Sequence, residues 1–229
     1  METHPQKRFI GGILCKISKK VFLQELRSGS VYMNRLDFYT KIENQENGDG
    51  FLDREEGLVC KDVNLTYEVN GSKFVFRNVS GYMGMATPVF CCSILKIPDL
   101  QEGEHWELSL DPRLVSDFSN GDVNEYGVLL ISKAEFCHQL QCAADRQNLI
   151  YYMGNVRYEK IKNSSENINH FPRAIFRKDP KYSYQNEYRI ALQKSIQKPF
   201  KFEIGDISEI SYLCDLNILK QPICLYVEK

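Results

Sequence analysis

The sequence has no run of the roughly 18 apolar residues that a membrane-spanning helix needs, and its polar start does not resemble a signal peptide. None of the eight cysteines is spaced as Cys-x-x-Cys, which argues against a zinc site. It also lacks a glycine-rich phosphate loop and a dinucleotide-binding fingerprint. These absences predict a cytoplasmic protein that does not contact a membrane.

The composition is that of a globular protein. The chain has 229 residues, of which 43% are hydrophobic, so it can bury a core without disulfides or metals. The cysteines lie largely inside apolar stretches, for example Cys15, Cys91 and Cys92, which is typical of reduced core thiols. No internal repeat, low-complexity tract or linker divides the chain. We therefore expect a single domain over residues 1–229.

The charges are unevenly distributed although the formal net charge is only -1. Residues 146–203 carry 12 Lys and Arg against five Asp and Glu. This basic segment, 146–201, predicts contact with an anionic partner, which is a nucleotide, a nucleic acid or an acidic protein surface. The alternative is a solvated, lysine-rich surface.

Apolar periodicity and turn residues predict the elements of the first half of the chain. We expect a strand over 9–17, a helix over 19–27 with Ser18 as its N-cap, a short strand at 31–33 and a short helix over 36–43. Residues 62–69 alternate polar and apolar, and Asn70-Gly71 then leads into a second apolar run at 73–76. This pattern predicts a half-buried hairpin with a type I′ turn.

The second half continues with strands and one clear helix. A capping box at Ser132–Glu135 predicts a helix running to about residue 146. We expect the strands at 81–95, broken near Pro88, and at 123–131, 149–158, 188–192, 200–204, 210–213 and 223–227. The pattern indicates an α+β fold, with a mixed, mainly antiparallel sheet and two or three flanking helices.

Residues 45–56 match most of a calcium-binding EF-hand loop. Asn47, Asp49, Asp53 and Glu56 stand at ligand positions of such a loop, and hard oxygens are the ligands that calcium prefers. However, Gln45 replaces the usual first carboxylate and Gly57 stands where an exit helix would begin. Two alternatives therefore remain beside calcium: a flexible acidic surface loop, and a loop that places Asp53, Glu55 or Glu56 at the edge of a pocket.

Two regions resemble a broad group of uncharacterised bacterial and prophage proteins. They are Lys16, Leu26–Gly29, Val31–Asn34, Leu36–Tyr39, Glu43 and Asp53–Gly57 near the start, and Lys178–Ile190 later. Some members of this group are thought similar to ADP-ribosyltransferase folds. The resemblance implies a phage or mobile-element origin, NAD as a candidate cofactor, and Glu187 as the catalytic carboxylate.

The chemistry that this resemblance implies fits the residue types near Glu187. Cleavage of the glycosidic bond of NAD passes through a cationic state that a fixed carboxylate stabilises. Arginines bind a diphosphate well, and the two-residue period of a strand places Glu187 and Arg189 on the same face. The candidate side chains for binding a nucleotide or another anion are Arg173, Arg177, Lys181, Arg189 and Tyr184.

Two functions follow from these observations. The first is a non-catalytic binding protein that engages an anionic partner through the basic segment. The second is an NAD-consuming or ADP-ribosyltransferase-like enzyme centred on Glu187. The enzyme requires Glu187 inside a concave pocket with Arg177 or Arg189 and aromatic walls, whereas the binding protein needs the same cations on an open face.

Overall fold

The computed structural model describes residues 11–41, 53, 55–95, 105–108, 111–119, 124–160, 171–217 and 223–226. The strands are β1 (Ile13–Lys19), β2 (Ser30–Arg35), β3 (Leu58–Val69), β4 (Ser72–Tyr82), β5 (Pro88–Leu95), β6 (His105–Leu108), β7 (Tyr126–Ser132), β8 (Tyr151–Asn155), β9 (Arg157–Tyr158), β10 (Arg177–Lys178), β11 (Glu187–Leu192), β12 (Phe200–Glu203), β13 (Ser211–Asp215) and β14 (Ile223–Tyr226). The helices are α1 (Lys20–Arg27), α2 (Leu36–Lys41), α3 (Pro112–Ser119), α4 (Lys133–Arg146) and α5 (Phe171–Ile175), with 3-10 helices η3 (Pro180–Gln185) and η4 (Ser208–Ile210).

Eight strands form the main sheet, and all of their pairings are antiparallel. The predicted α+β class with a mainly antiparallel sheet is confirmed. Strand β5 lies at a branch of this sheet. On one side it pairs with β11 through residues 89–93, and on the other it pairs with β2 at residues 88–89 and with β1 at residues 93–95. The sheet therefore divides along β5 between β2 and β1.

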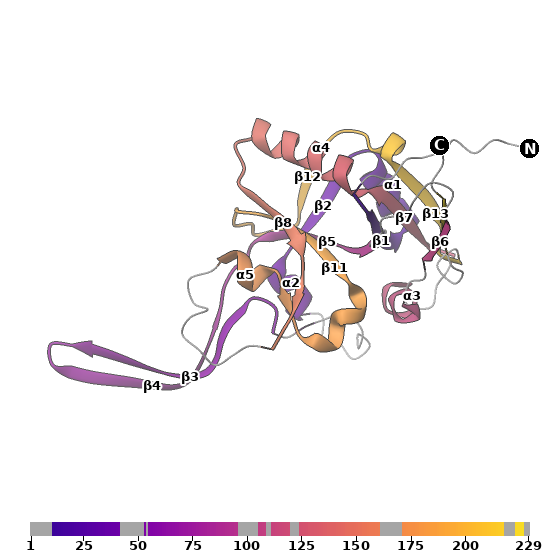
Figure 1. Ribbon diagram of the computed structural model, residues 1–229. Helices are drawn as coiled ribbons and strands as arrows, with labels where there is room; N and C mark the ends of the chain where they lie inside the picture. Colours follow the sequence, from indigo (N-terminus) through magenta and orange to yellow (C-terminus); the bar gives the residue numbers. More distant parts are fainter. Residues whose placement is uncertain are drawn as a thin grey trace, which may run out of the picture.

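One face of the sheet carries the largest apolar core. Helices α1 and α4 cover this face (Figure 1), and their buried side chains include Leu23, Leu26, Phe136 and Leu140. The helix over 133–146 begins where it was predicted, but the Ser132 side chain makes no capping hydrogen bond. Likewise, α1 has Lys19 rather than Ser18 at its N-cap. Packing of the apolar stripe against the sheet thus determines both helices more than their caps do.

The opposite face carries two smaller apolar clusters. One packs Leu114 of α3 against β1 and β7, and the other packs Leu36 of α2 with Ile175, Val89 and Ala191. Neither α3 nor β6 was predicted from the sequence. A group of buried charged residues lies on the same face of β11, next to the second cluster.

Strands β3 and β4 form a hairpin that projects away from the rest of the molecule (Figure 1). Asn70 and Gly71 have φ angles of 49° and 74°, as the predicted type I′ turn requires. The prediction that this hairpin is half buried is wrong, because most residues from Lys61 to Tyr82 are exposed. No helix among the described residues is long and apolar enough to cross a membrane.

Candidate functional site

Two charged residues lie on a strand that is otherwise apolar. All six residues of β11 are buried, including Glu187 and Arg189. The alternation of side chains along the strand points both residues to the face opposite the largest core, where their partners on β5 are Ser93 and Cys91. The left-handed residue Asn186 (φ 41°) ends η3 and directs the chain into β11. The predicted shared face of Glu187 and Arg189 is therefore present, but inside the protein.

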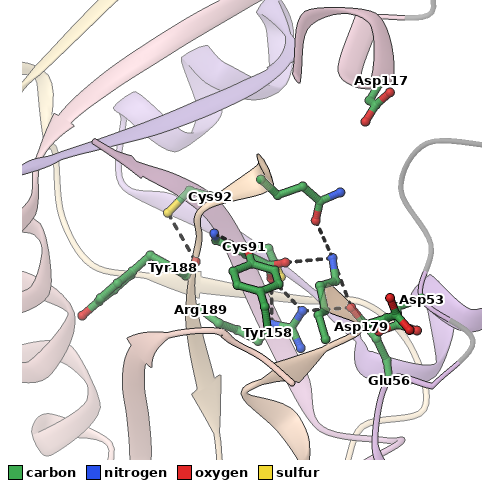
Figure 2. A network of polar contacts seen from close by, with 12 residues as sticks. Asp53, Glu56, Cys91, Cys92, Asp117, Tyr158, Asp179, Tyr188 and Arg189 are labelled. Carbon is green, nitrogen blue, oxygen red and sulfur yellow. Dashed lines mark hydrogen bonds and ion pairs between the residues drawn. The ribbon is translucent and has the colours of Figure 1, made fainter. Parts of the chain in front are cut away.

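Glu187 and Arg189 belong to a buried network of four charges that we call the ion cluster: Glu56, Lys178, Glu187 and Arg189. Glu187 accepts from Arg189 at 2.6 Å and from Lys178 at 2.8 Å. Glu56 Oε1 lies 2.9 Å from Arg189 Nη2 and 3.3 Å from Lys178 Nζ. Figure 2 shows Arg189 and Glu56 reaching the cluster from separate parts of the chain. Because two carboxylates face two cations, the formal charges cancel.

Neutral hydrogen-bonding groups complete the ion cluster. Lys178 Nζ donates to Gln185 Oε1 at 2.8 Å, and Arg189 Nη1 donates to the carbonyl oxygen of Ile175. The backbone N–H of Glu187 donates to the Tyr158 hydroxyl at 2.7 Å. All three nitrogens of the Arg189 guanidinium therefore contact protein acceptors, which fixes this side chain in one position.

A glycine brings Glu56 to the cluster. Gly57 has a φ angle of 72°, and a Cβ atom there would lie 2.8 Å from both the Met83 carbonyl oxygen and the Met85 sulfur. The chain can therefore turn tightly from Glu56 into β3 only because residue 57 lacks a side chain. Glu56 is 1% exposed, and its Oε2 atom has no hydrogen-bond partner among the described residues.

A cavity of about 290 Å³ lies against the ion cluster. All four charged residues of the cluster line it, together with two tyrosines, three cysteines and neighbouring residues of β1 and β5. The rings of Tyr39 and Tyr126 supply aromatic walls. Lys16 reaches the gap between β1 and β5, where its Nζ donates to the Cys91 carbonyl oxygen at 2.6 Å. The branch of the sheet at β5 thus provides the space for this cavity.

The ion cluster stabilises the charged forms of Glu187, Lys178 and Arg189. Burial opposes the ionisation of Glu187, but the charges of Arg189 and Lys178 outweigh burial and lower the pKa of Glu187 to about 2. Burial likewise opposes the charge on Lys178, whereas Glu187 and Glu56 raise the pKa of Lys178 above its ordinary value. Glu187 therefore remains an anion throughout the physiological pH range.

The cysteines of the cavity are not activated nucleophiles. Burial raises the pKa of Cys91 to about 12, and it also raises the pKa values of Cys15 and Cys92. A thiol reacts as its thiolate, and these thiols stay protonated near neutral pH. Burial raises the pKa of Tyr39 as well, so this phenol remains a neutral hydrogen-bonding group. Glu187, by contrast, carries a fixed negative charge at neutral pH.

The remaining candidate anion-binding residues do not meet at this cavity. Arg177 is 6% exposed and donates to the Leu58 carbonyl oxygen, where it holds the start of β3. Arg173 pairs with Glu159 at 3.2 Å, and the ammonium group of Lys181 lies 4.7 Å from the centre of the Tyr182 ring. The open face of cations that the binding hypothesis needs is not formed by Arg177 and Arg189, since both are buried.

Tyr184 also lies apart from the ion cluster. Its hydroxyl donates to the carboxylate of Asp117 on α3, and the Arg113 guanidinium stacks 4.0 Å from the centre of its ring. Burial, and then the bond to Asp117, raise the pKa of Tyr184 to about 12. These contacts attach η3 to α3, which makes Tyr184 a structural residue on this side of the molecule.

Of the four candidate calcium ligands, Asn47 and Asp49 lie outside the described residues. Asp53 is buried and accepts from the backbone N–H groups of Asp179 and Glu55, at 2.6 and 2.9 Å. Glu56 accepts from the cations of the ion cluster. Within the described ranges, no three His, Cys, Asp or Glu residues are grouped as metal ligands. The position of Glu56 at the cavity agrees instead with the pocket-edge interpretation of this loop.

No protein-family model, curated protein or solved structure matches the chain. The resemblance to prophage proteins and to ADP-ribosyltransferase folds therefore stays a prediction.

Proposed function

We propose that the protein is an enzyme that cleaves the N-glycosidic bond of a nucleotide such as NAD in the cavity beside β11. The observation that carries this proposal is the position of Glu187, which lines a concave cavity together with Arg189, Glu56 and tyrosine rings. This is the placement that separates the enzyme hypothesis from a binding protein with an open basic face.

The energetics of the ion cluster favour a functional role. Removing four charged groups from water carries a penalty of several kcal/mol for each ion, and apolar side chains of similar volume often stabilise such a site better. Apolar residues already pack beside the cluster, for example Val89 and Ala191. Charged groups held in a cavity at this expense are candidates for catalysis or ligand recognition.

Glu187 supplies a fixed negative charge in this proposal. As the glycosidic bond breaks, the bonding electron pair leaves on the nicotinamide and positive charge develops on the ribose. A preorganised carboxylate that remains ionised lowers the energy of this state. Arg189 and Lys178 act as positioning residues, because they hold the Glu187 carboxylate in one orientation.

Glu56 completes the proposed reaction. Water adds to the ribose carbon and must release one proton, and Glu56 Oε2 is a buried carboxylate oxygen without a partner among the described residues. Glu56 therefore serves as the base that accepts this proton. The products are nicotinamide and ADP-ribose, and no redox partner is needed. Attack by an acceptor hydroxyl or amine in place of water would give ADP-ribosyl transfer from the same site.

The test is a turnover assay with NAD, in which nicotinamide and ADP-ribose are measured by chromatography and mass spectrometry. We expect the wild-type protein to release both products and Glu56→Gln to lower kcat by about 100-fold or more, the range for loss of a general base. Glu55→Gln is the matched control, since Glu55 instead pairs with Lys61 at the surface. Absence of cleavage of NAD, NADP and nicotinamide riboside by the wild type would overturn the proposal.

A further inference from the structure

Strand β8 forms an outer edge of the main sheet. It pairs with β11 on one side, and no other described strand of the main sheet pairs with it. Val156 N–H donates to the Glu187 carbonyl, and Gln193 N–H donates to the Ile150 carbonyl. Residues 150 and 156 therefore direct these backbone groups toward β11, as do the even-numbered residues between them. Since backbone direction alternates along a strand, the N–H and C=O groups of Tyr151, Met153 and Asn155 point outward.

An open groove of about 690 Å³ runs along this edge. The five residues of β8 form one wall, and Pro172, Arg173 and Phe176 form the other. Gly154 contributes to the shape, because a Cβ atom there would be 3.9 Å from the Phe176 ring and would narrow the space between the walls. The groove thus combines outward-pointing backbone groups with a wall of side chains, which is the arrangement that accepts an extended peptide.

The charged side chains that line the groove indicate which kind of peptide it would bind. Among the described residues, its lining includes Arg157 and Arg173 and no Asp or Glu. Arg157 is exposed, while Arg173 is about half exposed and forms an exposed ion pair with Glu159 at 3.2 Å. Cations at this end of the strand are complementary to Asp or Glu side chains on an incoming segment.

The aromatic rings of the groove fit a peptide better than a nucleic acid. Tyr151 packs against the largest core, and Phe176 packs against the cluster of Leu36 and Ile175. The Tyr152 hydroxyl donates to Gln193 at 2.8 Å. Stacking of nucleic-acid bases requires open ring faces, whereas these rings already contact the protein.

We propose that an extended, acidic segment of a partner protein binds along β8 as an additional strand of the main sheet. Its backbone pairs with Tyr151, Met153 and Asn155, and its acidic side chains contact Arg157 and Arg173. This binding site is separate from the cavity at Glu187 and does not depend on the proposed enzymatic activity.

The test begins with selection of decapeptides from a random display library on the immobilised protein. We expect selected peptides to be rich in Asp, Glu and β-branched residues. One of them, labelled with a fluorophore, is then measured by fluorescence polarisation. Asn155→Pro removes one outward N–H without removing a bond to β11, so the Kd should rise about tenfold, the effect of one lost ladder hydrogen bond.

Matched variants separate this effect from misfolding. Asn155→Thr keeps the N–H and should leave the Kd unchanged, and circular dichroism should report the same fold for both variants. Arg157→Glu with Arg173→Glu should weaken binding and reduce its dependence on salt. The proposal is overturned if selected peptides lack acidic residues or bind Asn155→Pro as tightly as the wild type. Tighter binding of a short oligouridylate RNA, or a wild-type homodimer that Asn155→Pro dissociates, would overturn it as well.

Discussion

The ion cluster and the β3–β4 hairpin depart from the usual distribution of residues in opposite ways. Glu56, Lys178, Glu187 and Arg189 are charged and buried, whereas the hairpin exposes large apolar side chains. The pairs Leu65–Phe76 and Tyr67–Phe74 place four of these side chains on one face of the ribbon. Tyr67, for example, is 62% exposed.

The two regions are joined at the start of β3. Glu56 directly precedes Gly57 and β3, and Arg177 donates to Leu58 at the first residue of the strand. Leu58, Val59 and Cys60 are buried, and exposure begins at Lys61. One segment therefore anchors its first residues beside a charged cavity and presents the remainder to solvent. A substitution should therefore have a large effect near Glu56 and a small effect along the hairpin.

The largest effect is expected from removing a cation of the ion cluster. Arg189→Met would leave two buried carboxylates with only Lys178 opposite them, and breaking a buried ion network in this way costs about 3–5 kcal/mol of unfolding free energy. Urea denaturation measures this loss. Lys61→Met is the control, because its pair with Glu55 is exposed to solvent and contributes little to stability. Equal effects of the two substitutions would contradict the cluster's role.

The pH dependence of stability provides the next test. Because the pKa of Glu187 falls from an ordinary value of 4.5 to about 2 on folding, its contribution is complete above about pH 5. The contribution is lost as the pH falls from 5 toward 2, and it amounts to about 3 kcal/mol. Glu187→Gln should therefore flatten the curve of unfolding free energy against pH in this window. A curve as steep as that of the wild type would show that another group is responsible.

Two glycines with similar backbone angles give an internal comparison. Gly57 and Gly71 have φ angles of 72° and 74°, but a Cβ atom at Gly71 would meet nothing within 4 Å. Gly71→Ala should lower the unfolding free energy by about 1 kcal/mol from backbone strain alone. Gly57→Ala adds contacts at 2.8 Å to this strain and should have a clearly larger effect. Thermal unfolding measures the loss of stability in both variants. A larger loss for Gly57→Ala would show that close packing beside Glu56 adds to the backbone strain.

The smallest effect is expected on the hairpin. Phe74→Thr combined with Phe76→Thr keeps residues that favour strands and removes only exposed rings, so the unfolding free energy should change by less than about 1 kcal/mol. Phe136→Ala in the largest core is the contrast, with an expected loss of about 3–5 kcal/mol. A large loss from the hairpin variant would mean that its apolar face is covered.

From the sequence we could predict the strand pattern, the type I′ turn and the shared face of Glu187 and Arg189. It did not reveal that these two residues are buried, since alternation along a strand does not distinguish a charged surface from a charged interior. Glu56 and Arg189 are 133 positions apart, and no local sequence pattern indicates such a contact. The hairpin was expected to be half buried because alternation usually marks one covered face, and its exposure is a property of the tertiary structure.

Other elements were missed for local reasons. Helix α3 begins at Pro112 and has only eight residues, too few for a clear helical period. Helix α5 is shorter still. Lys178 lies within the motif that suggested the resemblance, but its partners Gln185 and Glu187 meet it only because η3 turns the chain back toward β11.

The most direct test of the proposed active site is a crystal structure of the Glu56→Gln variant soaked with NAD. Loss of the base should leave the substrate uncleaved and bound. We expect the nicotinamide and its ribose to occupy the cavity beside Glu187 that Tyr39 and Tyr126 line, with a polar group of the ligand at residue 56. A cavity that contains only water, or NAD bound at another surface, would contradict it.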